Sequence, residues 1–180
     1  GELIIMRERL TIVDAPTVVG GWVGPFGAPQ DFALPGLLLE VKAIRPTAAS
    51  IAISSVAQLD VASDVKLYLA VVTLASLQGE AADTFSVSNL VSQLRSSLST
   101  FPIASTEFEA RLRRAGYDDS AAYESFRFRT DAIRYYRVRH DFPKIARSQI
   151  PDGILDARYD LSRAMCDPFE VALEDGLGDS

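Results

Sequence analysis

The stretch QDFALPGLLLEVKAIRP, residues 30–46, decides how this chain folds. It contains two apolar runs separated by Pro35 and Gly36, which together are typical of a tight turn. We therefore expect strands at residues 31–34 and 37–44, joined as an antiparallel hairpin. Such a hairpin would bring Asp31 beside Glu40, although the two acids are nine residues apart in the sequence.

Two charged residues, Glu40 and Lys42, interrupt the otherwise apolar run LLLEVKAI. Residues two apart in a strand share a face, so both side chains should project from one side, with Leu39 and Val41 on the other. Because an isolated charge is costly to bury, this pattern indicates a charged partner or a metal ion. A structural ion pair, or the polar face of an edge strand, would explain the same pattern, and these alternatives remain open at this point.

Lysine is scarce in this chain, which has three Lys and fifteen Arg. A lysine at position 42 therefore favours a need for a compact ammonium, which can hold a water molecule or stabilise a charged transition state. Two carboxylates on neighbouring strands form the kind of hard-oxygen site that Mg²⁺ prefers. Asp31, Glu40 and Lys42 would then be a minimal set for the metal-assisted hydrolysis of a phosphodiester.

The same residues resemble a known motif. Residues 30–46 resemble the PD-(D/E)XK nuclease motif, with Asp31 as its first acid and Glu40-Val41-Lys42 as the E-x-K; Gln30 stands where the motif has Pro. More narrowly, the chain is similar to a bacterial family of PD-(D/E)XK phosphodiesterases found in restriction-like gene clusters. That similarity rests on the segments GEL, WVGPFGAPQDFALPG, EVKA, ISSVAQLD, LYLAVV and YYRVRHDFP, which span most of the chain.

The resemblance implies a role for each site residue. Asp31 and Glu40 would ligate Mg²⁺, for which Mn²⁺ can substitute, and the backbone carbonyl of Val41 would be a third ligand. Lys42 would orient the attacking water. Glu2, on a helix ahead of the strands, would complete the acidic cluster.

One further residue, Gln58, is a candidate for support of this site. A glutamine that follows the E-x-K strand contacts the site in some related nucleases. The hydroxyl of Ser55 followed three residues later by Gln58 also has the form of a helix capping box. Both interpretations of Gln58 stay open.

Charge is distributed unevenly along the chain. It has 18 basic and 24 acidic residues and a net charge of −6, yet residues 111–147 contain ten basic and five acidic residues. A local basic face can bind phosphates on an acidic protein, and a solvated arginine-rich sheet surface is the alternative. The DNA-binding candidates in this segment are Arg127, Arg129, Arg134, Arg137 and Arg139.

The remaining sequence predicts an α/β (α+β) protein with a restriction-endonuclease-like core, a mixed β-sheet flanked by helices, and a C-terminal β-rich extension. Residues 1–100 would form the core and residues 101–180 a helix and β-rich extension packed on it. Periodicity and capping residues predict helices at 2–10, 55–61, 86–98 and 105–115, and strands at 18–24, 51–54, 66–75, 123–138 and 154–161.

The function expected from these features is metal-dependent DNA cleavage by an endonuclease of a bacterial restriction or defence system. The alternative is a non-catalytic nucleic-acid-binding or assembly module that keeps the fold. DNA would be the partner, with a homodimer for double-strand cutting and an ATPase or methyltransferase as further partners. A single cysteine, Cys166, and no apolar run of membrane-spanning length favour a cytoplasmic protein without a membrane partner. The chain begins without Met, as a piece of a longer protein would.

Overall fold

A mixed β-sheet forms the centre of the molecule in the computed structural model, which describes residues 1–62, 64–77, 83–120, 123 and 126–172. Its elements are α1 (Glu2–Arg9), α2 (Ala15–Gly21), η1 (Gly24–Phe26), β1 (Phe32–Leu34), β2 (Leu37–Ile44), β3 (Ser50–Ile53), η2 (Val56–Gln58), β4 (Leu67–Leu77), α3 (Val87–Leu98), α4 (Pro102–Arg114), β5 (Arg127–Val138), η4 (Arg147–Gln149), β6 (Tyr159–Ser162), η5 (Arg163–Met165), η6 (Asp167–Phe169) and β7 (Glu170–Val171). Each helix in the described part of the chain is too short or too polar to cross a membrane.

The main sheet has five strands in the order β1-β2-β4-β5-β7. β2 and β4 pair in parallel, and the other neighbours pair antiparallel. β3 and β6 form a separate two-stranded sheet. The mixed α/β fold class predicted from the sequence is thereby confirmed. β4 and β5, which lie on either side of residue 100, are direct neighbours in one sheet, and the division of the chain at that residue stays a prediction.

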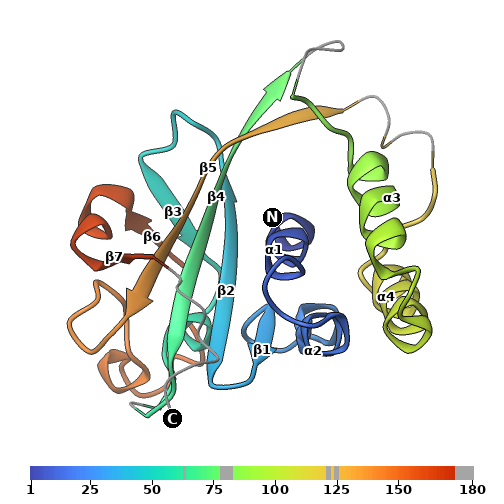
Figure 1. Cartoon of the computed structure of the whole chain (residues 1–180). Coiled ribbons are helices and arrows are strands. Elements are labelled where there is room, and N and C mark those ends of the chain that lie inside the picture. The colour runs from blue at the N-terminus through green and yellow to red at the C-terminus, as the bar shows by residue number, and fades with distance from the viewer. Residues whose placement is uncertain (63, 78–82, 121–122, 124–125, 173–180) are drawn as a thin grey trace.

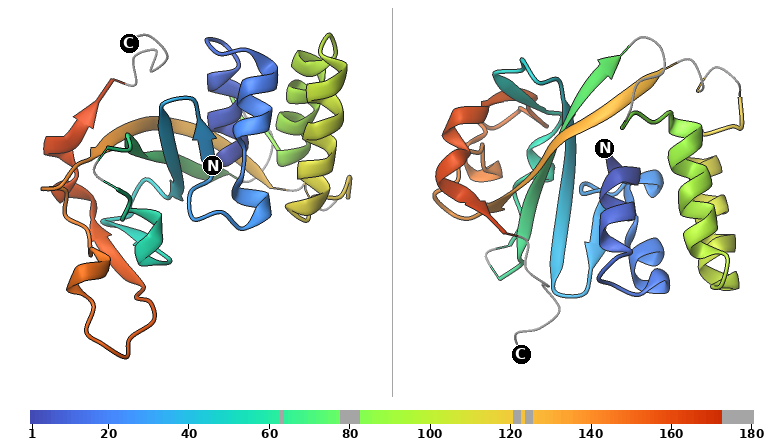
Figure 2. Two further views of the ribbon diagram at one scale, coloured as in Figure 1. Left: turned by 90° about the horizontal axis from the view of Figure 1, so that it is seen from below. Right: turned by 45° about the horizontal axis from the view of Figure 1, so that its top comes forward.

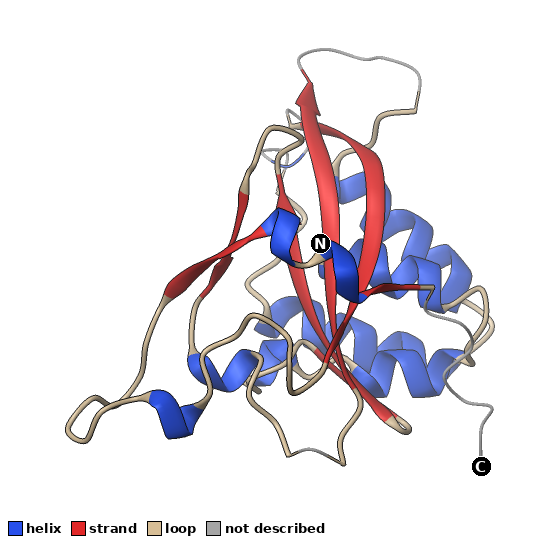
Figure 3. Cartoon of the chain, turned by 90° about the vertical axis from the view of Figure 1, so that its left-hand side faces the viewer, coloured by secondary structure: helices blue, strands red, loops and turns tan. Residues whose placement is uncertain are grey.

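Three layers arise because both faces of the main sheet are apolar. Helices α1 to α4 cover one face, and the small sheet with its connecting turns covers the other (Figures 1 and 2). Leu39, Val41 and Ala70 belong to the core on the helical side, whereas Leu69 and Val71 belong to the second core. Figure 3, viewed from the side of the small sheet, shows the loops and short helical turns of this second layer in front of the main sheet.

The predicted hairpin is present. Leu34 pairs with Leu37 and Phe32 with Leu39, so β1 and β2 are antiparallel strands joined through Pro35 and Gly36. Gly36 has a φ of 77°, a left-handed conformation that glycine adopts without steric cost. This register places Asp31, the residue before β1, next to Glu40.

Several predicted elements differ from the structure. The helix predicted at 55–61 is only the three-residue 3₁₀ helix η2, and the strand predicted at 123–138 begins at Arg127, with residues 124 and 125 outside the described part of the chain. Residues 18–24 do not form a strand: Asp14 caps helix α2 by accepting a hydrogen bond of 3.0 Å from Thr17 N, and Pro16 lies in its first turn. Proline stabilises that position because the first turn needs no N–H donor, and this outweighs the β-branched bias of Thr17-Val18-Val19. Helix α4 begins at Pro102 for the same reason, ahead of the predicted start. At 154–161 the strand is shorter, and β6 begins at Tyr159.

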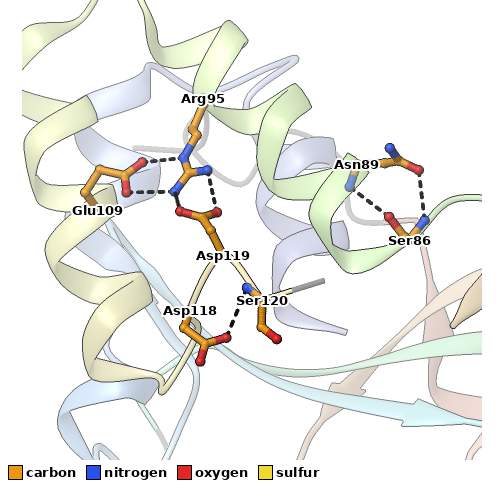
Figure 4. A network of polar contacts seen from close by, with 7 residues as sticks. All are labelled: Ser86, Asn89, Arg95, Glu109, Asp118, Asp119 and Ser120. Atoms are coloured by element: carbon orange, nitrogen blue, oxygen red, sulfur yellow. Dashed lines mark hydrogen bonds and ion pairs between the residues drawn. The ribbon is translucent and has the colours of Figure 1, made fainter. Parts of the chain in front are cut away.

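Helices α3 and α4 are joined by an arginine between two acids (Figure 4). Arg95 on α3 donates to both carboxylate oxygens of Glu109 on α4, at 2.7 and 3.0 Å, and to Asp119 at 2.9 Å. Ser86 and Asn89 form a capping box at the start of α3. These contacts link the two helices within the helical layer.

Candidate active site

The candidate site lies where β2 continues beyond its short neighbour. β1 pairs with β2 only as far as Leu39, so among the described residues no strand lies beside Glu40 and Val41 on that edge. The start of helix α1 lies beside this part of β2 instead (Figure 1). Residues from α1, β2 and η2, together with Asp31 just before β1, can therefore meet at this edge of β2.

Hydrogen bonds fix Asp31 at this edge of β2. Its Oδ2 accepts a hydrogen bond of 2.8 Å from Val41 N, and its backbone N–H donates to Leu39 O at 3.0 Å. Its backbone carbonyl accepts from Val23 N and Gly24 N at 2.9 and 3.0 Å. A Cβ at position 24 would lie 2.9 Å from Asp31 Oδ1, so the carboxylate leaves space there for glycine alone.

Glu40 and Lys42 share a face of β2, as their spacing predicts. Lys42 Nζ lies 2.9 Å from Glu40 Oε1, and the two side chains are 15% and 2% exposed. The structure thus contains the ion pair that sequence reasoning held as an alternative. Glu40 Oε2, however, is buried without a hydrogen-bond partner, so half of this carboxylate is left unsatisfied by the protein.

Gln58 reaches the same lysine from η2. Its Oε1 accepts hydrogen bonds from Lys42 Nζ at 3.0 Å and from Ser54 N at 2.8 Å. Ser55 makes no side-chain capping bond, so the capping-box interpretation is wrong and Gln58 contacts the site. The lysine ammonium therefore has two fixed acceptors, one on β2 and one on η2.

Sequence reasoning missed the contribution of Gln30. Its side chain is buried, and Nε2 donates to Ala57 O at 2.7 Å and Gln58 O at 3.2 Å. Gln30 therefore links η2 to the segment that carries Asp31. The sequence marks position 30 only as a departure from the motif, with Gln in place of Pro, and does not reveal its partners on η2.

Glu2 lies at the helix side of the site. Its Oε2 accepts a hydrogen bond of 2.6 Å from Trp22 Nε1, and a Cβ at Gly24 would lie 3.2 Å from the same oxygen. Since that Cβ would also touch Asp31, both acids border the same glycine. Arg111 on α4 in turn donates to the Trp22 carbonyl, which fixes the segment that carries these contacts.

Burial and neighbouring negative charge raise the pKa of both Asp31 and Glu40. Burial raises the pKa of Asp31 to about 6, and the neighbouring charge of Glu2 adds to this. Burial raises the pKa of Glu40 to about 8, with the charge of Asp31 as the next cause. In both cases Lys42 acts in the opposite direction but does not cancel the effect. A cation bound between these acids would relieve the same repulsion.

The carboxylate and carbonyl oxygens at this edge of β2 fit a hydrated divalent cation. In the described part of the chain, no group of three or more His, Cys, Asp or Glu side chains is arranged to hold a metal ion. Mg²⁺ is commonly held by one or two carboxylates, with water and substrate as its other ligands. The unsatisfied Glu40 Oε2 suits this role. Val41 bonds to Asp31 through its N–H, and its carbonyl points to the same edge because both groups of a strand residue do.

The five arginines predicted to bind DNA are not gathered at this site. Three are engaged elsewhere: Arg127 with Asn89 at 2.8 Å, Arg129 with Asp131 at 2.7 Å, and Arg134 with Glu170 at 3.2 Å and Asp167 at 3.8 Å. Arg137 and Arg139 instead line a separate cavity beyond the end of β5. The role of all five in DNA binding stays a prediction.

A comparison with known families shows the family of the chain, while the roles of the individual site residues stay predictions. A family model described as "Putative PD-(D/E)XK family member, (DUF4420)" matches residues 1–163, which include every residue of the candidate site. No curated protein and no solved structure matches the chain.

Proposed function

The chain belongs to this PD-(D/E)XK-related family, and on that premise we propose that it is a metal-dependent endonuclease that hydrolyses DNA phosphodiesters. Nucleases of this superfamily generally use divalent metals. The observation that carries the proposal is the meeting of Asp31, Glu40 and Lys42 at one edge of β2, with Glu40 Oε2 buried and unpartnered. A purely structural ion pair needs neither the adjacent second acid nor the free oxygen.

In this proposal Asp31 and Glu40 hold Mg²⁺, together with the Val41 carbonyl. The bound ion supplies Lewis-acid polarisation of the phosphodiester and lowers the pKa of a water molecule. Asp31 is oriented for this role by the Val41 N–H bond, which fixes one oxygen and leaves Oδ1 at Gly24. Glu2 adds negative charge near Asp31 and thereby favours a cation in the site.

Lys42 positions the attacking water. Its ammonium carries three donors, of which two point at Glu40 Oε1 and Gln58 Oε1. The third is free to hold a water molecule or a phosphate oxygen. Because both partners are themselves fixed, the ammonium is preorganised and needs little rearrangement when the substrate binds.

Cleavage of supercoiled plasmid DNA tests this function. We expect nicking or linearisation with Mg²⁺ or Mn²⁺, none with EDTA, and none by Asp31→Asn, which keeps an acceptor for Val41 N. An Asp31→Asn protein that cleaves like the wild type would show that the activity comes from elsewhere.

The second candidate is a nucleic-acid-binding or assembly module without catalysis. The Glu40–Lys42 ion pair favours it, because that contact gives each charge a partner of opposite sign without a metal. Binding of Mn²⁺ separates the two, since a module of this kind has no reason to bind the ion at Asp31 and Glu40.

Under the first proposal we also place the protein in the cytoplasm, in a restriction or defence system, as a homodimer acting with an ATPase or methyltransferase partner.

A further inference from the structure

The last turn of helix α4 contacts η1, the short segment that borders the acidic site. η1 begins at Gly24, where a Cβ would lie 2.9 Å from Asp31 Oδ1 and 3.2 Å from Glu2 Oε2. It ends two residues later at Phe26, so the Cα atoms of Gly24 and Phe26 are at most about 7.6 Å apart. Since DNA rises by about 3.4 Å per nucleotide, Phe26 lies within a few nucleotides of the acidic site along a bound strand.

Two arginines of α4 stack on the ring of Phe26, which is 53% exposed. The Cζ atoms of Arg111 and Arg114 lie 5.0 and 4.9 Å from the centre of that ring. Residues three apart share one face of a helix, so both arginines belong to the face that contacts η1. A guanidinium is attracted to the face of an aromatic ring, and the ring of Phe26 therefore orients both side chains.

The two arginines differ in what they leave available. The Arg111 side chain is 13% exposed, and its Nη1 donates to the Trp22 carbonyl, so it supports the segment before η1. Arg114 is exposed, and its Nε donates to Pro25 O at 3.0 Å. Its other two nitrogens, Nη1 and Nη2, have no acceptor among the described residues. Arg114 thus presents an oriented guanidinium with a free donor edge, a geometry that matches a phosphate.

A simpler explanation covers only part of these observations. Arginine is favourable in the last turn of a helix because it complements the helix dipole, and positions 111, 113 and 114 are all arginine. The dipole requires neither the Phe26 ring nor the contact to Pro25. Arg113 shows the difference, because it is exposed, lies about 100° around the helix from Arg114 and makes no side-chain contact of this kind in the described part of the chain.

We propose that Arg114 binds a backbone phosphate of double-stranded DNA close to the phosphate at the acidic site, with Phe26 as the ring that orients it. This proposal rests on the proposed function, because it takes DNA to be the ligand of the acidic site. A strand that places one phosphate at Asp31 carries its neighbouring phosphates toward η1. In a protein with a net charge of −6, an oriented cation at this position offsets the repulsion between the acids and the strand.

Fluorescence anisotropy of a labelled DNA duplex with the whole chain in EDTA tests this proposal. The variants are Arg114→Gln, Phe26→Leu and the combination of both. Arg113→Gln is the matched control, because it removes the same charge from an exposed position in the same helical turn. Since Phe26, Arg113 and Arg114 are all exposed, the circular dichroism of each variant should equal that of the wild type.

We expect Arg114→Gln to weaken binding by about tenfold, the usual effect of losing one charged hydrogen bond. The slope of log K against log salt concentration should also fall by about one, because one phosphate contact is lost. Phe26→Leu should weaken binding less and should add nothing in the Arg114→Gln background, where no guanidinium is left to orient at position 114. Arg113→Gln should change both quantities little.

Three outcomes would overturn the proposal. They are absence of duplex binding by the wild type, equal effects of Arg114→Gln and Arg113→Gln, and a full effect of Phe26→Leu in the Arg114→Gln background. Because no cleavage takes place in EDTA, the binding result stands apart from hydrolysis. A wild type that binds the duplex through Arg114 but leaves plasmid DNA intact with Mg²⁺ would refute the proposed function and retain the phosphate contact.

Discussion

Lys42 Nζ lies 2.9 Å from Glu40 Oε1, and both side chains leave β2 on the face turned toward η2. The lysine is thereby fixed between a carboxylate and the Gln58 amide oxygen, at 3.0 Å from the latter. The same carboxylate keeps its second oxygen buried and unpartnered. One oxygen of Glu40 thus contacts the lysine, and under the proposed function the other would bind the metal ion.

Lys42→Arg tests the need for a compact ammonium. The lysine side chain is 15% exposed and confined by its two acceptors, so a longer planar guanidinium displaces whatever the ammonium holds. Displacing a nucleophile by about 1 Å can cost on the order of a hundredfold in rate. We expect a folded protein that binds Mn²⁺ normally and loses nearly all cleavage in a plasmid assay.

The control for this prediction is Lys66→Arg, because Lys66 is exposed just before β4. It should cleave at the wild-type rate. If Lys42→Arg also cleaves normally, the lysine is a simple ion-pair partner and its assigned role is wrong.

Glu40→Gln tests the metal site without opening a cavity. Glu40 is buried, so alanine would remove packing as well as charge, whereas glutamine keeps the shape and an acceptor for Lys42. We expect Glu40→Gln to fold, to lose Mn²⁺ binding by about tenfold or more, and to lose cleavage. Calorimetry with Mn²⁺ and circular dichroism measure the two effects. Unchanged Mn²⁺ affinity would place the ion elsewhere.

The raised pKa values predict how stability depends on pH. A carboxyl group whose pKa is higher in the folded protein stabilises the fold below its unfolded pKa, and this stabilisation is lost as the pH rises through the folded value. Glu40, with a pKa of about 8, and Asp31, with a pKa of about 6, should therefore destabilise the metal-free protein as the pH rises from about 4 to about 8.

Thermal unfolding in EDTA across this pH range measures that loss. Glu40→Gln cannot ionise, so its melting temperature should fall less steeply with pH than that of the wild type. Added Mg²⁺ should protect the wild type most at high pH, where both acids are ionised. Parallel curves for the two proteins would contradict the burial-driven shift of Glu40.

The strands of the site could be predicted because each depends on local chemistry. Pro35 and Gly36 specify the turn, and the alternation around Glu40 specifies the face, so β2 has the predicted bounds Leu37–Ile44. The region before it could not be predicted in the same way. Asp14 and Pro16 start a helix there, whereas the β-branched residues around Val18 led to the prediction of a strand, which is wrong.

The polar contacts that position Gln58 depend on tertiary structure and were beyond the sequence pattern. Gln30, in the segment before β1, donates to Ala57 O and Gln58 O, a relationship between residues far apart in the chain. The same holds for Trp22, whose indole N–H on Glu2 makes it a contact of the site as well as a core residue. The proposed roles of these residues follow from contacts, and substitution is required to test them.

Gln58→Ala tests whether η2 positions the lysine. The variant removes the acceptor of Lys42 Nζ and Ser54 N, while the backbone of η2 stays held by Gln30. We expect the cleavage rate constant to fall about tenfold with little change in the KM for DNA, because binding contacts remain and orientation is lost. A fall in affinity alone would assign Gln58 to DNA binding instead.

Salt dependence of DNA binding tests which arginines meet phosphates. Each phosphate contact contributes about 0.9 to the slope of log K against log salt concentration, because counterions are released from the DNA. Arg139 is exposed and lines the cavity beyond the end of β5, so Arg139→Gln should weaken binding and reduce the slope by about one. Arg129 is paired with Asp131 at 2.7 Å, so Arg129→Gln removes a charge that the protein already neutralises and should leave the slope unchanged.

Fluorescence anisotropy with a labelled duplex in EDTA at several salt concentrations measures both slopes. Equal slopes for the two variants would show that DNA responds to the net charge of the protein, and that the cavity at the end of β5 takes no phosphate of the duplex.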